Sequence, residues 1–269
     1  MIDIQPYPPA RHLAPYVVGY FSGTMNAQAE AGISYTMIPN GCVELIVHLD
    51  EMYCQLPAST GLSNTPDYML IGLFSQPYRV HFQHTVPIFS IRFNPEAIPL
   101  LLGVPGKEVL DTYEDIELLL DQYFRDFCHR VRECRQTADR VGHADEFLTR
   151  LLAHRKHTTA YVTAGTGMIR DGVGEPLEDI SRRLHISQRQ FERKFKEQIG
   201  ITPKRYQRLM RIRKVMQTLE QYQSLDLTSV AYYCGYYDQA HFIKDFKQVT
   251  GKAPSVYRQD EQRFLYLPS

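Results

Sequence analysis

The chain has 269 residues, 30 Lys and Arg against 30 Asp and Glu, and 43% hydrophobic residues. This length is typical of about two domains, and this composition excludes a disordered chain. No apolar run approaches the roughly 18 residues that cross a membrane. Residues 1–13 lack the basic and apolar regions of a secretory signal, so we expect a cytoplasmic protein without a membrane partner.

The cysteines are odd in number, and no pair has Cys-x-x-Cys spacing. They are Cys42, Cys54, Cys128, Cys134 and Cys234. This pattern disfavours a disulfide scaffold and a structural zinc site, and it fits a reducing cytoplasm. We expect neither a metal nor a cofactor in this chain.

The neutral net charge hides an asymmetry between the two halves of the chain. Residues 1–154 carry 10 Lys and Arg against 18 Asp and Glu, and residues 155–269 carry 20 against 12. An acidic half joined to a basic half predicts that only the C-terminal half meets a polyanion.

Residues 1–95 are rich in Pro and Gly and hold short β-branched and aromatic runs, such as Cys42–Leu49, Arg79–Phe82 and Ile88–Phe93. Short strands at this spacing predict an antiparallel sandwich or barrel. Helical periodicity follows over residues 95–154. It predicts a helix that begins at Pro95 and ends at Gly103, and two more over Asp115–Cys134 and Ala144–Leu152.

The polar stretch 153–160 marks the change of charge, so we place a domain boundary between residues 1–154 and 155–262. The apolar stripe of Asp115–Cys134 leaves two interpretations open. It covers the open side of the barrel, or it forms a dimer interface.

The C-terminal part of the chain repeats itself. Residues 177–208 match residues 227–259, first at an offset of 50 and then of 51. The identical pairs on the second register are Phe191 and Phe242, Phe195 and Phe246, Lys196 and Lys247, Gly200 and Gly251, Pro203 and Pro254, and Tyr206 and Tyr257. A duplicated segment of this length indicates two copies of one structural unit.

Each copy has the pattern of a helix-turn-helix, at residues 177–200 and 227–251, with a linking helix over residues 203–222. The turn is His185-Ile186 in the first copy and Gly235-Tyr236 in the second, followed by Ser187 or Asp238 as N-cap of the second helix. The shared Phe residues then lie on one buried face of each second helix.

The opposite faces of these helices are rich in polar and basic residues. The first copy presents Arg189, Glu192, Arg193 and Lys196, and the second presents Ala240, Ile243, Lys244 and Lys247, with Gln239 beside them. Of these, the Arg, Lys and Gln side chains can donate hydrogen bonds to base edges. A basic helix face is most often only solvated, but two such faces in a duplicated, positively charged segment favour DNA. A rigid basic linking helix would hold the two reading helices about one DNA turn apart, roughly 34 Å.

The second copy also carries a recognisable motif: Ala231, Gly235-Tyr236, His241-Phe242, Phe246-Lys247, Gly251, Pro254 and Tyr257-Arg258. Residues 160–260 resemble the DNA-binding domain of AraC/XylS-type bacterial transcription regulators. The resemblance implies a seven-helix, all-α domain that binds double-stranded DNA through two recognition helices. The implied base-reading residues are Arg189, Glu192, Arg193, Gln239, Ala240 and Lys244. The implied backbone contacts are Ser187, Gln188, Lys196, Asp238 and Lys247.

Residues 39–45 and 91–95 resemble sensor or dimerisation domains that precede such modules, often a cupin-like β-barrel followed by helices. We therefore expect an α+β protein overall. Glu44 and Arg92 are candidates for a polar ligand. A metal at the three histidines His48, His81 and His84 is disfavoured, because His81 and His84 would point to opposite faces of a strand. Oxidant sensing at Cys42 or Cys128 is disfavoured too.

The leading hypothesis is a sequence-specific transcription regulator, of the activator class and not an enzyme, whose N-terminal domain senses a small molecule or dimerises. Two alternatives stay open: an N-terminal cupin-like enzyme, and a constitutive regulator without a ligand. RNA polymerase and a second copy of the chain are further open partners. A repair methyltransferase is disfavoured, because Phe127 stands where its Pro-Cys-His-Arg run needs proline.

Overall fold

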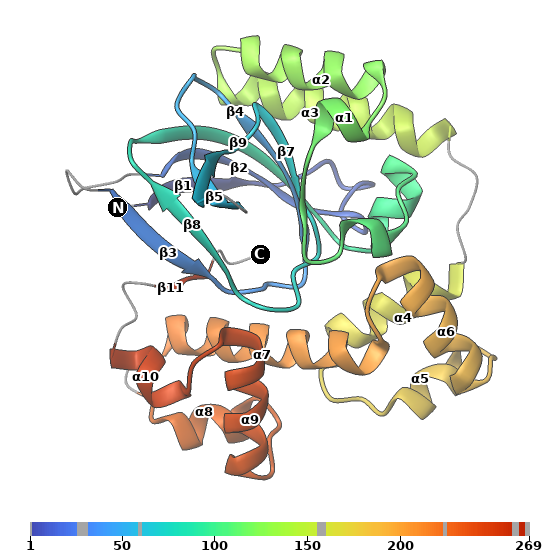
Figure 1. The fold of residues 1–269 in the computed structure, drawn as a ribbon. Coiled ribbons are helices and arrows are strands. Elements are labelled where there is room, and N and C mark those ends of the chain that lie inside the picture. Colours follow the sequence, from blue (N-terminus) through green and yellow to red (C-terminus); the bar gives the residue numbers. More distant parts are fainter. Residues whose placement is uncertain are drawn as a thin grey trace.

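The computed structural model describes residues 2–25, 32–58, 61–154, 160–222, 225–259 and 264–266. Figure 1 shows a β-rich N-terminal part above a helical C-terminal part. The α+β class expected from the sequence is confirmed, with two sheets in the N-terminal part and two helix-turn-helix units in the C-terminal part.

The strands form one six-stranded and one five-stranded sheet. The six-stranded sheet has the order β1 (Ile2–Tyr7), β2 (Val17–Met25), β9 (Val86–Phe93), β4 (Val43–His48), β7 (Tyr68–Ile71) and β10 (Tyr113–Asp115). The five-stranded sheet has the order β11 (Phe264–Leu265), β3 (Ile33–Met37), β8 (Tyr78–Phe82), β5 (Gln55–Ala58) and β6 (Gly61–Asn64). Neighbours are antiparallel except β11 and β3, which are parallel. The three strands expected from the sequence are confirmed as β4, β8 and β9.

Side chains that alternate along the central strands contribute to two apolar layers, one on each face of the six-stranded sheet. On β4, Val43, Leu45 and Val47 belong to the large core that the helices share, whereas Ile46 faces the other sheet. The space between the sheets is filled by residues of both, such as Ile46 and Phe82. Successive side chains of a strand point to opposite faces, so a single strand supplies both layers.

After β9 the described chain forms the π-helix η1 (Ile98–Leu102), the 3-10 helix η2 (Gly106–Val109) and, beyond β10, the helices α1 (Ile116–Leu119), α2 (Gln122–Glu133) and α3 (Thr137–His154). The helix expected from Pro95 is wrong in its start and type, because Pro95 lies in a turn and a short π-helix begins at Ile98. Gly103 ends it in the left-handed conformation, as expected.

The single helix expected over Asp115–Cys134 is also wrong. The segment is divided into the end of β10, α1 and α2. Asp115 and Asp121 divide it, because each carboxylate accepts a backbone N–H of the helix that follows and so begins a new helix. Phe124 and Phe127 of α2 are buried and contact Phe147 of α3. The apolar stripe thus packs within the large core, as the covering interpretation requires.

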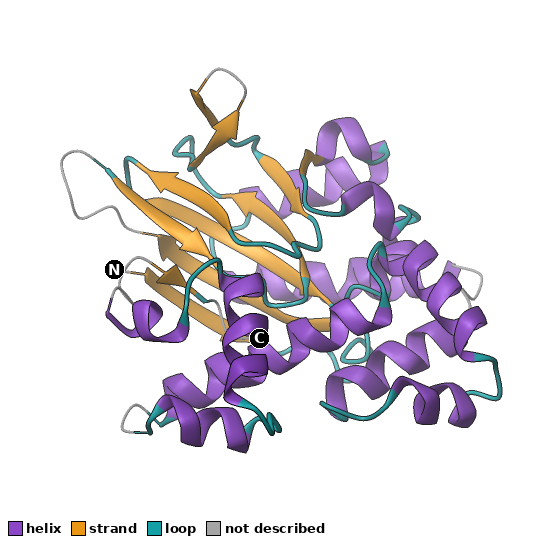
Figure 2. Ribbon diagram, turned by 60° about the horizontal axis from the view of Figure 1, so that its bottom comes forward, coloured by secondary structure: helices purple, strands orange, loops and turns teal. Residues whose placement is uncertain are grey.

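The C-terminal helices are α4 (Ala160–Asp171), α5 (Leu177–Arg183), α6 (Gln188–Ile199), α7 (Pro203–Gln221), α8 (Leu227–Tyr233), α9 (Gln239–Thr250) and α10 (Pro254–Gln259). They gather along one side of the sheets in Figure 2. The expected domain boundary falls between α3 and α4, where residues 155–159 lie outside the described residues. No helix in the described ranges is both long enough and apolar enough to cross a membrane.

Candidate nucleic-acid interface

The first helix-turn-helix consists of α5 and α6. His185 forms the turn at a φ of 55°, in the left-handed region. Ser187 then accepts a hydrogen bond from the Gln190 backbone N–H at 3.3 Å, and Gly200 ends α6 at a φ of 93°. The turn and the N-cap expected from the sequence are both confirmed.

The second helix-turn-helix, of α8 and α9, repeats this geometry. Asp226 caps α8 by accepting backbone N–H groups of Thr228 and Ser229. Gly235 makes the turn at a φ of 82°, a conformation that glycine adopts without steric cost. Asp238 caps α9 by accepting the Ala240 backbone N–H at 2.9 Å.

The two recognition helices bury equivalent aromatic faces. Phe191 and Phe195 of α6 are fully buried, with ring centroids 5.5 Å apart. Phe242 and Phe246 of α9 are buried in the same way, at 5.7 Å. An amphipathic helix that buries this face must present its other face outward.

The outward face of α6 presents Arg189, Arg193 and Lys196, which are all exposed. Glu192 is partly buried and accepts a hydrogen bond from the Gln188 amide at 2.8 Å. This bond to Gln188 orients the Glu192 carboxylate, which can still accept a hydrogen bond from a base. On α9 the candidates Gln239, Ala240, Lys244 and Lys247 are all exposed, together with Ile243.

An acidic residue that sequence reasoning missed attaches α9 to α7. Asp245 is buried, and its carboxylate accepts a hydrogen bond from Arg208 at 2.7 Å and lies 3.8 Å from Arg211. The Tyr236 hydroxyl donates to the same carboxylate at 3.4 Å, and His241 lies within 3.5 Å. Arg208 and Arg211 of α7 therefore fix the position of α9. The feature of the sequence that could have indicated this contact is Asp245 itself, an acidic residue within a helix that otherwise carries only basic charges.

The C-terminal ends of both recognition helices rest on the N-terminal domain. A Cβ added to Gly106 of η2 would lie 2.2 Å from the Gln198 carbonyl oxygen of α6. A Cβ added to Gly251, which ends α9, would lie 3.2 Å from Pro77, next to β8. The donor-rich first turns of the two helices are at the opposite ends, and Figure 1 shows α8 and α9 on the side of α7 away from the sheets.

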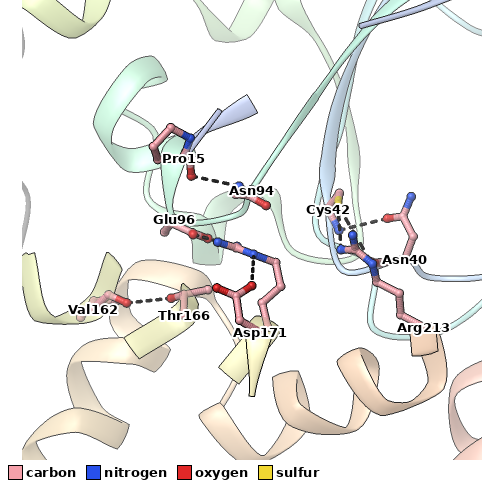
Figure 3. A network of polar contacts seen from close by, with 10 residues as sticks. Pro15, Asn40, Cys42, Asn94, Glu96, Val162, Thr166, Asp171 and Arg213 are labelled. Carbon is pink, nitrogen blue, oxygen red and sulfur yellow. Dashed lines mark hydrogen bonds and ion pairs between the residues drawn. The ribbon is translucent and has the colours of Figure 1, made fainter. Parts of the chain in front are cut away.

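Polar contacts join α4 and α7 to the N-terminal domain (Figure 3). Arg170 of α4 pairs with the buried Glu96 at 2.9 Å. Burial raises the pKa of Glu96, and the Arg170 guanidinium opposes this shift. Arg213 of α7 donates to the Cys42 thiol at 3.8 Å. Beside these contacts lies an open cleft of about 650 Å³, whose lining includes Arg170 and Arg213.

The candidate ligand residues Glu44 and Arg92 face each other between the sheets. Arg92 is 1% exposed and lies 3.3 Å from Glu44, whose carboxylate also accepts from Ser90 at 2.6 Å. The Arg92 guanidinium stacks over the Phe21 ring at 4.1 Å. A cavity of about 30 Å³, room for about one water, lies next to Glu44.

The histidines considered as metal ligands lie apart from one another. His48 is buried and bonds Thr65 at 3.2 Å, and burial lowers its pKa. His81 bonds Ser34, while His84 lies beyond the end of β8. Within the described ranges, no group of three or more His, Cys, Asp and Glu residues could hold a metal ion.

The two cysteines considered as oxidant sensors are both buried. Burial raises the pKa of Cys42, and it raises the pKa of Cys128 to about 12. A reactive cysteine needs a lowered thiol pKa, so both environments have the opposite effect.

Two family models match separate parts of the chain. Residues 180–260 match the "Helix-turn-helix domain", and residues 5–115 match the "Domain of unknown function (DUF6597)". Among curated proteins, the transcriptional activator RhaS of Escherichia coli O157:H7 is 31% identical over 86 residues, which are 32% of this chain and 31% of RhaS. The activator RhaR of Pectobacterium atrosepticum is 35% identical over 99 residues, which are 36% of this chain and 34% of RhaR. The chain thus spans about a third of the length of these relatives.

Among solved structures, ToxT from Vibrio cholerae O395 aligns at a TM-score of 0.48 and 12% identity, covering 88% of this chain and 95% of ToxT. A transcriptional regulator with an AraC-type DNA-binding domain from Chromobacterium violaceum aligns at a TM-score of 0.34 and 25% identity, covering 37% of this chain and 90% of that one. The helix-turn-helix match at residues 180–260 coincides with the duplicated units built on α5–α6 and α8–α9. Over residues 180–260 the chain therefore contains a helix-turn-helix domain, and in this region it is similar to the transcriptional activators RhaS and RhaR.

Proposed function

We propose that this protein is a sequence-specific DNA-binding regulator of transcription, and not an enzyme, that inserts α6 and α9 into successive major grooves. One observation carries the proposal: two capped reading helices bury the same Phe face and expose opposite faces rich in donors. A single continuous helix, α7, joins them. Two such helices on one rigid spacer fit two half-sites on one face of a duplex.

The exposed side chains divide into base readers and backbone contacts. Arg189 and Arg193 can bond guanine bidentately, and Gln239 can bond adenine in the same way. Glu192 can accept from cytosine, and Ala240 can contact a thymine methyl group, while Lys244 donates to base edges. The backbone set is Ser187, Gln188, Lys196, Asp238 and Lys247. Of these, the lysines pair with phosphates, and Ser187 and Asp238 fix the helix N-termini that approach them.

A comparison of substitutions on α6 and α9 with selected DNA tests the proposal. After sites are selected from random DNA with the full chain, we expect Arg193→Ala and Lys244→Ala each to weaken specific binding by about 1–3 kcal/mol. Lys194→Ala is the matched control, because Lys194 has the same charge on the same helix but pairs with Glu197 at 2.9 Å. Binding by the wild type should also fall steeply with salt, because neutralised phosphates release counterions.

Two results would refute this assignment. The first is a wild-type protein that shows no preference among DNA sequences. The second is a Lys194→Ala variant that loses as much specific affinity as Arg193→Ala. Circular dichroism of each variant would show that its helices are retained.

The N-terminal domain is proposed to sense a small polar molecule at Glu44 and Arg92. An ion pair buried between two sheets costs more desolvation than an apolar pair would, and the neighbouring residues between these sheets are largely apolar. The adjacent space of about 30 Å³ means that an effector must displace lining side chains to enter. We expect one member of a metabolite panel to raise the melting temperature of the wild type but not of Glu44→Gln, which keeps the size of the side chain and removes its charge; Ser90→Ala, which leaves the ion pair in place, is the control and should still respond. If no metabolite changes the melting temperature, the constitutive alternative holds.

Three further parts of the proposal concern context. RhaS and RhaR are named as transcriptional activators, and we propose activation for this chain as well, which implies contact with RNA polymerase. Transcription in vitro with and without the protein measures this activation. A homodimer is proposed through the outer face of α2 and α3, where Asp126, Arg130, Glu146 and Arg150 offer both signs of charge. Sedimentation over a range of concentrations measures this association. The proposed location is the cytoplasm.

A further inference from the structure

The last strand of the chain returns to the N-terminal domain. β11 follows the second helix-turn-helix and pairs in parallel with β3, with Phe264 opposite Thr36 and Leu265 opposite Met37. Without β11, strand β3 would be an edge strand of the five-stranded sheet, with one row of its backbone polar groups unpaired. An edge of this kind is a site for strand addition, and here the added strand comes from the DNA-binding half of the same chain.

The residue after β11 anchors this strand. Tyr266 is 6% exposed, and its buried hydroxyl has no hydrogen-bond partner among the residues that the structure describes. Burial raises the pKa of Tyr266, and the charges of Arg213 and Arg92 act on it in the opposite direction. Tyr266 therefore lies where α7 meets the sandwich, close to both domains. Among the described residues, the contact of Tyr266 is therefore made by its aromatic ring and not by its hydroxyl.

A row of aromatic rings connects β11 to the second reading helix. The Phe264 ring lies 5.1 Å from the Tyr257 ring of α10. Tyr257 in turn lies 5.7 Å from Phe246 of α9. A displacement of β11 would therefore remove packing from the helix that reads the second half-site.

We propose that β11 is a brace: by adding to the edge of β3, it ties the second helix-turn-helix to the N-terminal sandwich and fixes the orientation of α9 relative to α6. This inference rests on the proposed DNA-binding function and adds a positioning role for residues 264–266. The pairing of β11 with β3 leaves the outward face of α9 exposed, so β11 does not cover the residues proposed to contact DNA. The brace holds this arrangement before DNA arrives and so reduces the ordering cost of binding.

Two altered proteins and one control test the brace. The first is a chain that ends at residue 263, and the second is Tyr266→Ala; the control is Tyr266→Phe, which keeps the ring and removes only the unbonded hydroxyl. Hydrogen exchange of the β3 amides reports the pairing without any DNA. The positioning of α9 is measured by the rate of dissociation from two DNAs. One is a selected DNA with both half-sites, and the other carries only the first half-site, the one that α6 is proposed to contact.

We expect the truncated chain and Tyr266→Ala to exchange their β3 amides faster and to dissociate from the two-half-site DNA about tenfold faster. Binding to the first half-site alone should not change, and Tyr266→Phe should behave like the wild type in all three measurements. Unchanged β3 exchange after truncation would overturn the pairing, and unchanged or slower dissociation would overturn the positioning role. A wild type that binds no DNA would instead refute the proposed function, and the exchange measurement would still decide whether β11 pairs with β3.

Discussion

Phe246→Ala should lower the free energy of unfolding by about 3–5 kcal/mol, the cost of a cavity left by a fully buried phenylalanine. Phe246 is completely buried and packs between Phe242 and Tyr257, with centroid distances of 5.7 Å to each. Phe195→Ala should cost a similar amount, because Phe195 occupies the equivalent position in the first unit, between Phe191 and Tyr206. Denaturant titration followed by circular dichroism measures both changes.

Ile243→Ala is the control for this pair of substitutions. Ile243 lies on the same helix as Phe246, but on the exposed face, so its removal should change the free energy of unfolding by less than about 0.5 kcal/mol. The control should instead weaken DNA binding if the outward face of α9 reads a thymine methyl group. Phe variants with the stability of the wild type would show that the buried and reading faces have been exchanged.

The second large effect concerns the DNA. Inserting about half a helical turn, roughly 5 bp, between the two half-sites should abolish tight binding, because it moves them to opposite faces of the duplex. Insertion of a full turn should fail to restore it completely. The physical reason is α7, a 19-residue helix whose N-terminus is capped by Thr202 and which Asp245 attaches to α9 through Arg208. Such a helix cannot lengthen to follow the separated half-sites.

Gel-shift titration of the spacing series measures this effect, with a DNA that carries the first half-site alone as the reference. The first half-site should also show the stricter base preference. At equivalent positions α6 presents Arg189 and Glu192, which can bond base edges, whereas α9 presents the apolar Ala240 and Ile243. Undiminished affinity across the half-turn insertion would contradict docking by two helices. Equal sequence information in both half-sites would contradict the division between the helices.

The helix-turn-helix units could be predicted from the sequence in detail. Their signals are local: a 3.6-residue apolar period, a capping Ser187 or Asp238, and a left-handed turn at His185 or Gly235. The duplication strengthened the prediction, because the same Phe positions recur in both units at a fixed offset. The strands β4, β8 and β9 could also be predicted, because their β-branched and aromatic runs are local signals.

Local signals gave wrong boundaries where capping competed with periodicity. The apolar stripe over Asp115–Cys134 continues without a break, and the caps at Asp115 and Asp121 divide the segment into β10, α1 and α2. A side chain of Asp can either point to solvent within a helix or begin a new one, and packing against the sheet decides between these states.

The sequence by itself therefore determined the helix-turn-helix units, their buried faces and their exposed donors, because neighbouring residues on one helix set all three. Only the tertiary structure decided how these units are attached. Asp245 of α9 accepts a hydrogen bond from Arg208 of α7, and Arg170 of α4 forms an ion pair with Glu96 of the N-terminal domain. Phe264 of β11 lies opposite Thr36 of β3, more than 200 residues away in sequence. Such contacts join residues that are distant in sequence. The hydrophobic period and residue spacing of a short segment therefore cannot predict which residue will pair with a buried charge or with an unpaired strand edge.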